Sequence, residues 1–488
     1  MPESGSFANV ATSVERWVDD CETPVSAFLK LRGSGPCFLL ESAEHGGRMG
    51  RYSFIGIRPH ATIRWSDGVL VEWGPGRCDL DAEPDRRVDA PDPYAAVAER
   101  LARIRIEPES ELPAFPGGAV GLFAYDLVRT VEPLGEPNPD PLGLPDLALM
   151  IPEVVVVFDH HRREISILAH AYLDEGGEEA AAARALAEVR AELRRDVPRP
   201  DAISVVDPPR FVSNMTKQGF EANVARIIEY VKAGDAFQVV PSQRFSAPCP
   251  VEAFSIYRGL RVINPSPYMY FLDFGDFEIA GASPEPLVKV SGRDVSVRPI
   301  AGTYPRGADE EEDRRAAAAM LADPKERAEH VMLVDLGRND LGRVCEYGTV
   351  KVVEMMVVET YSHVLHIVSE VAGRLRPELT ALDVLRSALP AGTVSGAPKV
   401  RAMQIIDELE TVKRCSYGGA IGYVGFNGDL DVAIHIRTVV VKDGQAHVQA
   451  GGGTVADAVP EREYRESVQK AKAIFGAVEL AAAHPDWP

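Results

Sequence analysis

The sequence predicts a mixed α+β protein in which strands and helices come in blocks and not in a regular βαβ repeat. Three observations support this fold class. Short runs rich in β-branched and aromatic residues, separated by turn residues, dominate the first 197 positions. Helical patterns then arrive in long blocks. The composition, with 45% hydrophobic and 26% charged residues among 488, is that of an ordinary globular protein.

In chain order, the first strands are expected at 35–44, 51–65, 119–128 and within 149–170. The last of these ranges predicts two strands around a polar turn at Asp159–Arg163. An Ala- and Glu-rich helix is expected over 177–195, and a proline-rich stretch follows it. We therefore expect an N-terminal region at 1–197, a linker at 198–210 and a second domain at 211–483.

The second half begins with a predicted helix at 217–234 and a strand at 235–246. Further strands are expected at 268–274, 277–283, 287–292 and 294–303. A helix is predicted after Arg314, and the final helix is predicted to begin at Pro460, a residue favoured at the first helical position.

The charge and the cysteines exclude several classes of protein. A net charge of −21 argues against general binding to nucleic acid or to an anionic membrane, which both require basic surfaces. The polar, acidic N terminus predicts no signal peptide, and the longest apolar run, at 147–158, is too short to span a bilayer. Six cysteines without C-x-x-C spacing imply neither a zinc site nor a disulfide framework, so we expect a cytoplasmic protein.

Two Glu-x-x-Glu pairs stand at the start of predicted helices: Glu326 with Glu329, and Glu463 with Glu466. Residues three apart share one face of a helix. Each pair alone is more often solvated surface, because Glu is a good helix former that is usually exposed. Two such pairs that faced each other would repel unless a hard divalent cation lay between them. Spacing cannot show that the two helices face each other.

A glycine-rich segment, "VQAGGGTVADA" at 448–458, matches the dinucleotide fingerprint G-x-G-x-x-A. A nicotinamide oxidoreductase is rejected, because the fingerprint requires a second parallel strand after the helix and no strand follows here. Two interpretations remain open. The segment is either a cluster of backbone N–H groups that binds a carboxylate or a plain tight turn.

Two other motifs carry weaker signals. "PAGTVSGAPK" at 390–399 is no Walker loop, but its composition suggests an anion-holding turn at the start of a helix. His363 and His366 in "SHVLHIVSEV" would point to opposite faces of a strand, so they cannot form a metal pair. A lone His such as His366 on an apolar face is more often a core residue than an acid or base.

Seven motifs in order resemble the chorismate-utilising enzymes. They are "GASPEPLVKV", "VRPIAGTYPRG", "EHVMLVDLGRNDLGRV", "YSHVLHIVS", "LPAGTVSGAPKVRAM", "GGAIGYVGF" and "GGG…EREYRES". Within that family they are most similar to the anthranilate synthase component I group. The similarity is dense from Phe211 to the C terminus and thin before it. It implies a two-domain α/β sandwich, with large antiparallel or mixed sheets flanked by helices and a chorismate-binding catalytic domain at 211–483.

The resemblance also implies an activity. Ammonia would attack chorismate at C2 as the C4 hydroxyl leaves, giving 2-amino-2-deoxyisochorismate, and loss of pyruvate would then give anthranilate. This is the first step of tryptophan biosynthesis. The implied cofactor is Mg²⁺, the implied inhibitor is tryptophan, and the implied partner is a glutamine amidotransferase subunit (component II) in a heterotetramer. No Cys here lies tightly between glycines as the nucleophile of such an amidotransferase does, so a separate subunit is expected.

Residue by residue, the resemblance implies the following roles. Glu329 and Glu466 would bind Mg²⁺ directly, with Glu326 and Glu463 as outer partners. Glu285 would be the general acid, His366 would serve pyruvate elimination, and Thr303 would be a third catalytic residue. The substrate would be bound by Thr303, Gly396, Tyr423, Arg437, Gly451, Gly453 and Lys470. Tryptophan would be bound by Leu40, Glu41, Ser42, Pro265, Ser266, Tyr268 and Met269.

Two positions distinguish this chain from related members of the family. Gln238 stands where isochorismate-forming members carry a Lys that activates water, and Ala301 stands where aminodeoxychorismate synthases often carry a nucleophilic Lys. Both favour anthranilate as the product. Two departures are that Tyr304 replaces a frequent Arg and Gly452 a frequent Ala. The alternatives are a synthase that stops at 2-amino-2-deoxyisochorismate, then an aminodeoxychorismate synthase, then a non-catalytic sensor subunit.

Overall fold

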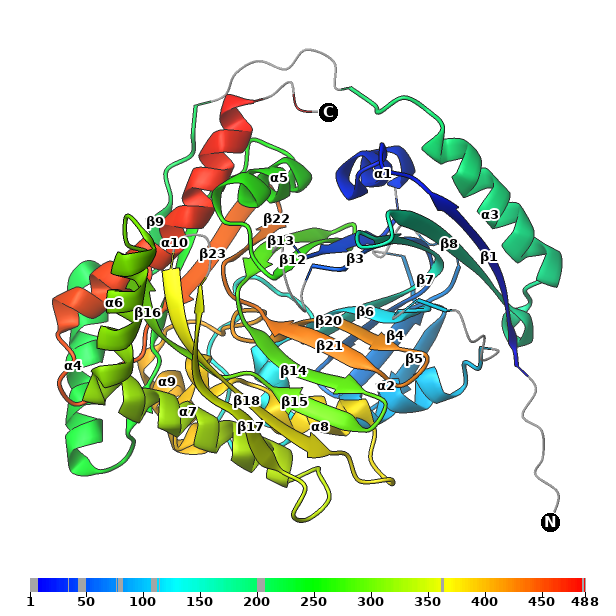
Figure 1. Ribbon diagram of the computed structural model, residues 1–488. Coiled ribbons are helices and arrows are strands. Elements are labelled where there is room, and N and C mark those ends of the chain that lie inside the picture. The colour runs from blue at the N-terminus through cyan, green and yellow to red at the C-terminus, as the bar shows by residue number, and fades with distance from the viewer. Residues whose placement is uncertain are drawn as a thin grey trace.

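The computed structural model describes residues 8–33, 35–42, 50–75, 77, 82–106, 112–113, 115–199, 207–360, 364–484 and 487. Within them, 21 strands join into one sheet system, and two short strands form a second sheet. The ladders between the named strands are antiparallel, as in the long pairing of β3 with β7. The expected α+β class, with large antiparallel sheets flanked by helices, is confirmed (Figure 1).

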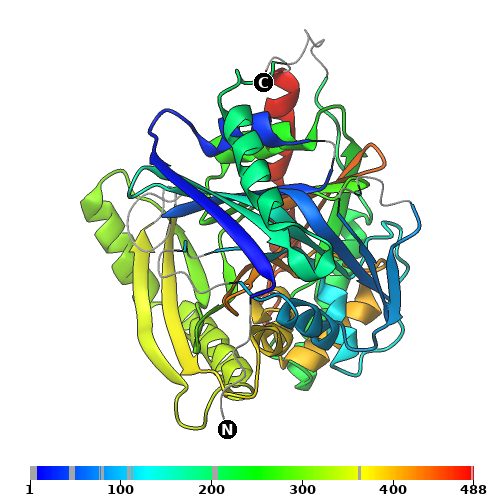
Figure 2. The same ribbon diagram turned by 90° about the vertical axis from the view of Figure 1, so that its right-hand side faces the viewer.

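The N-terminal half forms long strands with three helices against them. The strands are β1 (Val10–Val18), β2 (Cys37–Glu41), β3 (Tyr52–Ser66), β4 (Val69–Trp73), β5 (Arg86–Asp89), β6 (Gly118–Phe123), β7 (Leu147–Asp159) and β8 (Glu164–Tyr172). The helices are α1 (Pro24–Leu31), α2 (Pro93–Ala102) and α3 (Glu179–Leu193). Figure 2 shows α3 and β1 crossing on one side of the molecule. The hairpin predicted around Asp159 is present as β7 and β8.

The second half continues the same sheet system. Its strands are β9 (Val212–Ser213), β10 (Gln238–Val239), β11 (Ser242–Pro248), β12 (Tyr268–Asp273), β13 (Phe277–Ser283), β14 (Pro286–Ser291), β15 (Asp294–Val297), β16 (Ile300–Pro305), β17 (Lys351–Thr360), β18 (Val364–Arg374), β19 (Gly396–Ala397), β20 (Ala420–Gly425), β21 (Leu430–Ile434), β22 (Thr438–Lys442) and β23 (Gln445–Gly451). Its helices are α4 (Lys217–Ala233), α5 (Ala253–Ile263), α6 (Glu310–Ala322), α7 (Pro324–Gly342), α8 (Ala381–Ala388), α9 (Lys399–Leu409) and α10 (Pro460–Ala483).

Strands from the two halves pair with each other. β2 pairs with β12, and β6 pairs with β20. The sheet system therefore runs across the boundary that the proline-rich stretch suggested, and the division at 198–210 stays a prediction. Helices α5 and α10 lie side by side and bury their apolar faces in one core together with β12 and β13 (Figure 1). A second core lies under α7 and α8.

Two predicted elements are divided for local reasons. The strand expected at 235–246 is broken between β10 and β11, because Val240 donates its N–H to the carbonyl of Ser395 and Pro241 has no N–H to offer a ladder. The helix expected after Arg314 is two helices, because Pro324 cannot continue α6 and starts α7 instead. Asp323 caps α7 by accepting bonds from the N–H groups of Lys325 and Glu326.

A buried ion pair joins the segments around the carboxyl end of α9. Arg414 Nη2 lies 2.5 Å from Glu410 Oε1, and the two side chains are only 2% and 4% exposed. Arg414 also donates to the carbonyls of Val394 and Val240, at 2.6 Å each. Glu410 in turn accepts the N–H and the hydroxyl of Ser242, at 2.8 Å each. Among the described residues, no helix is long and apolar enough to cross a membrane.

Candidate active site

The two Glu-x-x-Glu pairs face one another across a glycine loop. Glu329 at the start of α7 accepts a hydrogen bond from Gln238 Nε2 at 3.2 Å. A Cβ on Gly452 would lie 3.3 Å from both Glu463 Oε2 and Glu466 Oε1 at the start of α10. The sequence could not establish this arrangement, and it removes the interpretation that both pairs are separate patches of solvated surface.

The electrostatics agree with this proximity. Burial raises the pKa of Glu463 to about 7, and the negative charges of Glu466 and Glu329 add to the rise. The pKa of Glu326 is raised by burial and by the charge of Glu329. Glu326 lies against β16, since a Cβ on Gly302 would be 3.0 Å from its Oε2.

Lys470 is the cation that the fold places beside this acidic cluster. Its Nζ lies 2.7 Å from Glu466 Oε1 and donates to the carbonyl of Gly451 at 2.9 Å. Its charge also lowers the pKa of Glu463 and that of Glu285. Lys470 therefore links the α10 carboxylates to the glycine loop and to a third carboxyl group. Lys325 also lowers the pKa of Glu463 and of Glu326, but two ammonium groups do not balance four carboxylates. Among the described residues, no three acidic, His or Cys side chains converge tightly enough to form a preformed metal site.

Glu285 follows β13 in a half-buried turn. Thr393 donates its hydroxyl hydrogen to Glu285 Oε1 at 2.9 Å. Burial raises the pKa of Glu285 to about 7, while the bond from Thr393 and the charge of Lys470 oppose that rise. A carboxyl group that titrates near neutrality can hold a proton and give it up, as a general acid must. The "PAGTVSG" segment thus supplies the partner of an acid, a role that its composition did not reveal.

His366 on β18 is held as one tautomer. Its Nδ1 lies 2.7 Å from the carbonyl oxygen of Gly302, so Nδ1 carries the hydrogen and Nε2 keeps a lone pair. Burial, followed by the charge of Arg437, lowers the pKa of His366 and keeps the ring neutral near pH 7. A neutral imidazole of this tautomer can accept a proton at Nε2. The backbone of Thr303 pairs with that of His366, so β16 and β18 bring these two predicted residues together. His363 lies outside the described residues.

Arg437 lies close enough to the acidic cluster for its charge to interact with that of Glu466. Burial lowers the pKa of Arg437, and the charges of Tyr417 and Glu466 oppose that shift. Tyr417 is buried, and burial raises its pKa to about 12, while the Gly451 backbone opposes the rise. A guanidinium beside a phenol that keeps its proton forms a pair of donors suited to a carboxylate.

Tyr423, which is predicted to bind the substrate, lies in an aromatic cluster away from Arg437. Its ring packs against Phe115 and Phe54, with centroids 4.5 Å and 5.9 Å apart. Tyr417 stands beside Arg437 instead. Both tyrosines belong to the single stretch "SYGGAIGY", and sequence alone cannot tell which of them faces the pocket.

Gly396 and the glycines at 451–453 have different structural roles. Gly396 (φ 132°) pairs with Val239, and a Cβ there would meet the carbonyl oxygen of Gln238 at 2.2 Å, so only glycine lets β10 and β19 hold Gln238 in place. Gly452 donates its N–H to Pro241 at 3.4 Å. The backbone N–H of Gly453 has no hydrogen-bond partner among the described residues. The glycine segment is therefore both a tight turn and a candidate anion cradle.

The predicted regulatory residues fall on the two faces of one strand pair. Met269 pairs with Glu41, and Tyr270 with Leu40. Glu41, Ser42, Pro265 and Met269 line an open groove of about 730 Å³. Glu41 is buried there and binds Arg261 Nε at 3.0 Å. Leu40 and Tyr268 face the other side, where the Tyr268 hydroxyl donates to Asp431 at 3.0 Å and Tyr423 is a neighbour. Ser266 is buried and bonds its own turn at Asn264.

Comparisons with known proteins agree with this geometry. The family model described as chorismate binding enzyme matches residues 35–476. The chain is 49% identical to anthranilate synthase component 1 of Pseudomonas aeruginosa over 469 residues, which are 95% of this chain and 94% of that protein. It is also 49% identical to the protein of the same name from Thermus thermophilus, over 95% of this chain and 97% of that one.

Solved structures show the same likeness. The crystal structure of anthranilate synthase component I from Streptococcus pneumoniae matches with a TM-score of 0.79 and 41% identity, covering 94% of this chain and 99% of that one. The menaquinone-specific isochorismate synthase MenF of Escherichia coli matches with a TM-score of 0.71, over 96% of this chain and 95% of that one. Its 18% identity shows a shared fold only.

The pKa of Glu285 predicts a dependence of stability on pH. Its ordinary value is 4.5 and its value in the fold is about 7, so the folded chain binds a proton that the unfolded chain releases between these limits. The contribution of Glu285 to stability is therefore full below about pH 4.5 and is lost as the pH rises through about 7. Glu285→Gln removes this dependence. We expect the variant to gain stability relative to wild type between about pH 5 and about pH 8.

Urea unfolding at a series of pH values measures this difference. Glu164→Gln, at a partly exposed carboxylate at the start of β8, is the matched control. A constant difference between wild type and Glu285→Gln across that range would contradict a raised pKa.

Proposed function

Because this chain belongs to the chorismate binding enzyme family, we propose that it makes anthranilate and pyruvate from chorismate and ammonia, through 2-amino-2-deoxyisochorismate. The relatives are named anthranilate synthase component 1, a name that agrees with anthranilate as the product. The proposed reaction would begin tryptophan biosynthesis. One observation carries the proposal: a proton-holding acid, a neutral imidazole and a buried guanidinium surround a cluster of four carboxylates.

Binding of chorismate would use the positive side of the pocket. Arg437 and the Tyr417 hydroxyl offer donors for the enolpyruvyl carboxylate, and the Gly453 amide adds a third. Arg437 is well suited because burial has already removed its water. The ring would then lie between Glu285 and His366. The net charge of −21 does not prevent this, since local donors dominate at contact distance.

The first chemical step needs a proton for the leaving group. Protonated Glu285 donates to the C4 hydroxyl, so that water leaves as ammonia forms the bond to C2 and the ring double bond shifts. Thr393 holds the carboxyl group in place for this transfer. Gln238 occupies the nucleophile side, where an amide leaves ammonia neutral and offers no base to activate water.

The second step aromatises the ring. Nε2 of His366 accepts the proton from C2, the C3–O bond breaks, and the enolpyruvyl group leaves as pyruvate after taking up a proton. The bond from Nδ1 to Gly302 keeps Nε2 unprotonated before the transfer and stabilises the imidazolium after it.

We propose Mg²⁺ as the cofactor. The residues fit it, since Glu329 and Glu466 offer hard oxygen ligands from two facing helices and Mg²⁺ commonly takes one or two carboxylates, waters and an anionic ligand. Burial, followed by the charges of Glu466 and Glu329, raises the pKa of Glu463, and the charges of Lys470 and Lys325 do not cancel the rise. Glu326 and Glu463 would stand as outer partners. When bound, the ion would neutralise the carboxylates and attract the ring carboxylate of the substrate.

We also propose a partner subunit that releases ammonia from glutamine. The relatives are each named component 1, which implies a further component. The five described cysteines are free, and burial raises the pKa of Cys37, Cys249, Cys345 and Cys415, so none of these four is an activated thiolate. A heterotetramer in the cytoplasm, where such free thiols persist, is the assembly we propose.

Feedback inhibition by tryptophan is proposed for the β2–β12 strand pair. Met269 on β12 is in register with Ala282 on β13, and the N–H of Ala282 donates to the carbonyl of Arg437 at 3.1 Å. Glu285 follows three residues later. A ligand that shifts β12 can therefore displace both the acid and the guanidinium, provided that it prefers that arrangement.

The metal proposal predicts the effect of two substitutions. Glu329→Gln or Glu466→Gln should lower kcat/KM by at least about a hundredfold, since each removes a direct ligand and even outer partners usually cost 10–100-fold. Chelation should abolish turnover in wild type. Glu479→Gln, at an exposed position on α10, should leave activity unchanged. Full activity in excess chelator would exclude a required metal ion.

The product proposal is tested by one assay. Purified chain with chorismate, Mg²⁺ and an ammonium salt should release anthranilate and pyruvate in equal amounts, and glutamine should not replace ammonium. His366→Met should accumulate 2-amino-2-deoxyisochorismate, whereas His161→Met, at an exposed turn, should not. Fluorescence and product chromatography distinguish these results. If wild type stops at the amino intermediate, the alternative synthase is correct.

The regulatory proposal predicts a selective loss of inhibition. Ser42→Leu should raise the tryptophan concentration needed for half inhibition by about tenfold, because it fills the groove beside Glu41 and Met269. Activity without tryptophan should stay close to wild type. Ser66→Leu, at an exposed serine, is the control. An unchanged rate in millimolar tryptophan would show that wild type lacks the regulatory site.

A further inference from the structure

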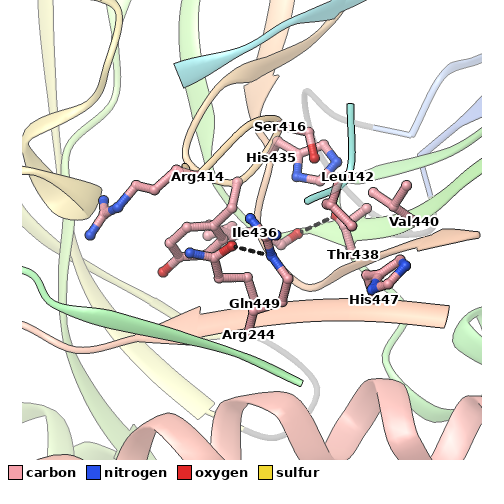
Figure 3. Close-up of a pocket in the computed structure, with 11 residues that line it drawn as sticks. Leu142, Arg244, Arg414, Ser416, His435, Ile436, Thr438, Val440, His447 and Gln449 are labelled. Atoms are coloured by element: carbon pink, nitrogen blue, oxygen red, sulfur yellow. Dashed lines mark hydrogen bonds between the residues drawn. The ribbon is translucent and has the colours of Figure 1, made fainter. Parts of the chain in front are cut away.

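A small polar cavity lies beside Tyr417, which forms part of its wall. Arg244, Arg414, Tyr417, His435, Thr438 and Gln449 are among the residues that line it (Figure 3). Its water-accessible volume is about 20 Å³, which is room for about one water-sized species. No Asp or Glu is among its lining residues, although the chain as a whole is strongly acidic.

Arg244 brings a charge that no carboxylate balances. The residue is 4% exposed, its Nε donates to Gln449 Oε1 at 3.2 Å, and its Nη2 donates to the carbonyl of Lys413. Its Nη1 is buried without a hydrogen-bond partner, and in the described part of the chain no carboxylate lies within ion-pair distance of the guanidinium. Arg414 on the same wall differs, because Glu410 neutralises it. A buried cation without a counter-charge is costly.

His435 adds an unused donor. It is 3% exposed, and neither ring nitrogen has a partner on another described residue. Burial lowers its pKa to about 3, so the ring is neutral and keeps one N–H to donate. The Thr438 hydroxyl cannot serve it, because that group already bonds the Ile436 carbonyl at 2.8 Å and the Tyr270 hydroxyl at 2.6 Å. Buried donors of this kind are normally satisfied.

We propose that this cavity binds one small monovalent inorganic anion of about the size of chloride. The anion accepts hydrogen bonds from Nη1 of Arg244 and from the ring N–H of His435, and it supplies the negative charge that Arg244 lacks. A water molecule would satisfy the donors but would leave the charge unbalanced. The inference is independent of the proposed function, and Tyr417 is the residue that the anion site and the substrate pocket share.

Halide binding predicts a specific stabilisation. An ion that binds only the folded chain stabilises it in proportion to the logarithm of its concentration above Kd. At constant ionic strength, replacing gluconate by chloride or bromide should therefore raise the melting temperature of wild type. Arg244→Met should weaken the apparent halide Kd by at least about tenfold. Arg226→Met should not change it, since Arg226 is an exposed residue of α4 that pairs with Glu229.

Anomalous scattering gives a test that needs no variant. Crystals of wild type grown in bromide should show an anomalous peak inside the cavity, within hydrogen-bond distance of Arg244 Nη1. A cavity that holds only water would overturn the proposal. So would a halide dependence in solution that Arg244→Met leaves intact, or a peak at crystal concentration that has no counterpart in the melting experiment.

Discussion

The buried ion pair of Arg414 and Glu410 is the constraint on which the pocket depends. Its hydrogen bonds reach Val240 and Ser242 on one segment and Val394 on another. Gln238 lies just before the first segment, and Thr393 lies in the second. Arg414 itself stands three residues before Tyr417. One charge pair thus holds the partner of Glu329, the partner of Glu285 and the phenol beside Arg437 in fixed relation. Removing either member would leave a buried charge alone, which typically costs about 3–5 kcal/mol.

The pocket separates positive from negative charge within a short span. The helix starts of α7 and α10 hold four carboxylates, and the Gly452 backbone and the charge of Arg437 lie close to those of α10. Such an arrangement repels itself without a cation, and a substrate that carries two carboxylates can complete it. The same environment determines the protonation states of Glu285 and His366. Burial lets Glu285 keep a proton near neutral pH and keeps His366 without one, so the two groups are ready for opposite transfers.

The continuous sheet connects the pocket to more distant surfaces. β2 pairs with β12, β12 with β13, and β13 with β22, so a shift in the N-terminal strand reaches the turn at Glu285 through backbone hydrogen bonds alone. Backbone ladders transmit displacement because their spacing is fixed by hydrogen-bond geometry. The cavity at Arg244 and His435 lies against β11, β22 and β23 of the same system.

The sequence by itself determined most of the elements and the family to which the chain belongs. Periodicity located α4 and α10, turn residues located the β7–β8 hairpin, and the ordered motifs located Glu285, His366 and Arg437. These features are local, because propensity and spacing act over a few residues. The helix break at Pro324 is local as well. The sequence pattern did not predict it, because apolar residues continue across it.

Only the tertiary structure decided which groups meet. That the two Glu-x-x-Glu pairs face each other depends on α7 and α10, whose acidic starts are more than 130 residues apart in the chain. That Tyr417 and not Tyr423 lies beside Arg437 depends on the side of β20 that faces the aromatic core. The partners Thr393 and Gln238 depend on the Arg414–Glu410 pair. Each of these contacts joins segments distant in sequence, and burial alone selects between faces that a local pattern leaves equivalent.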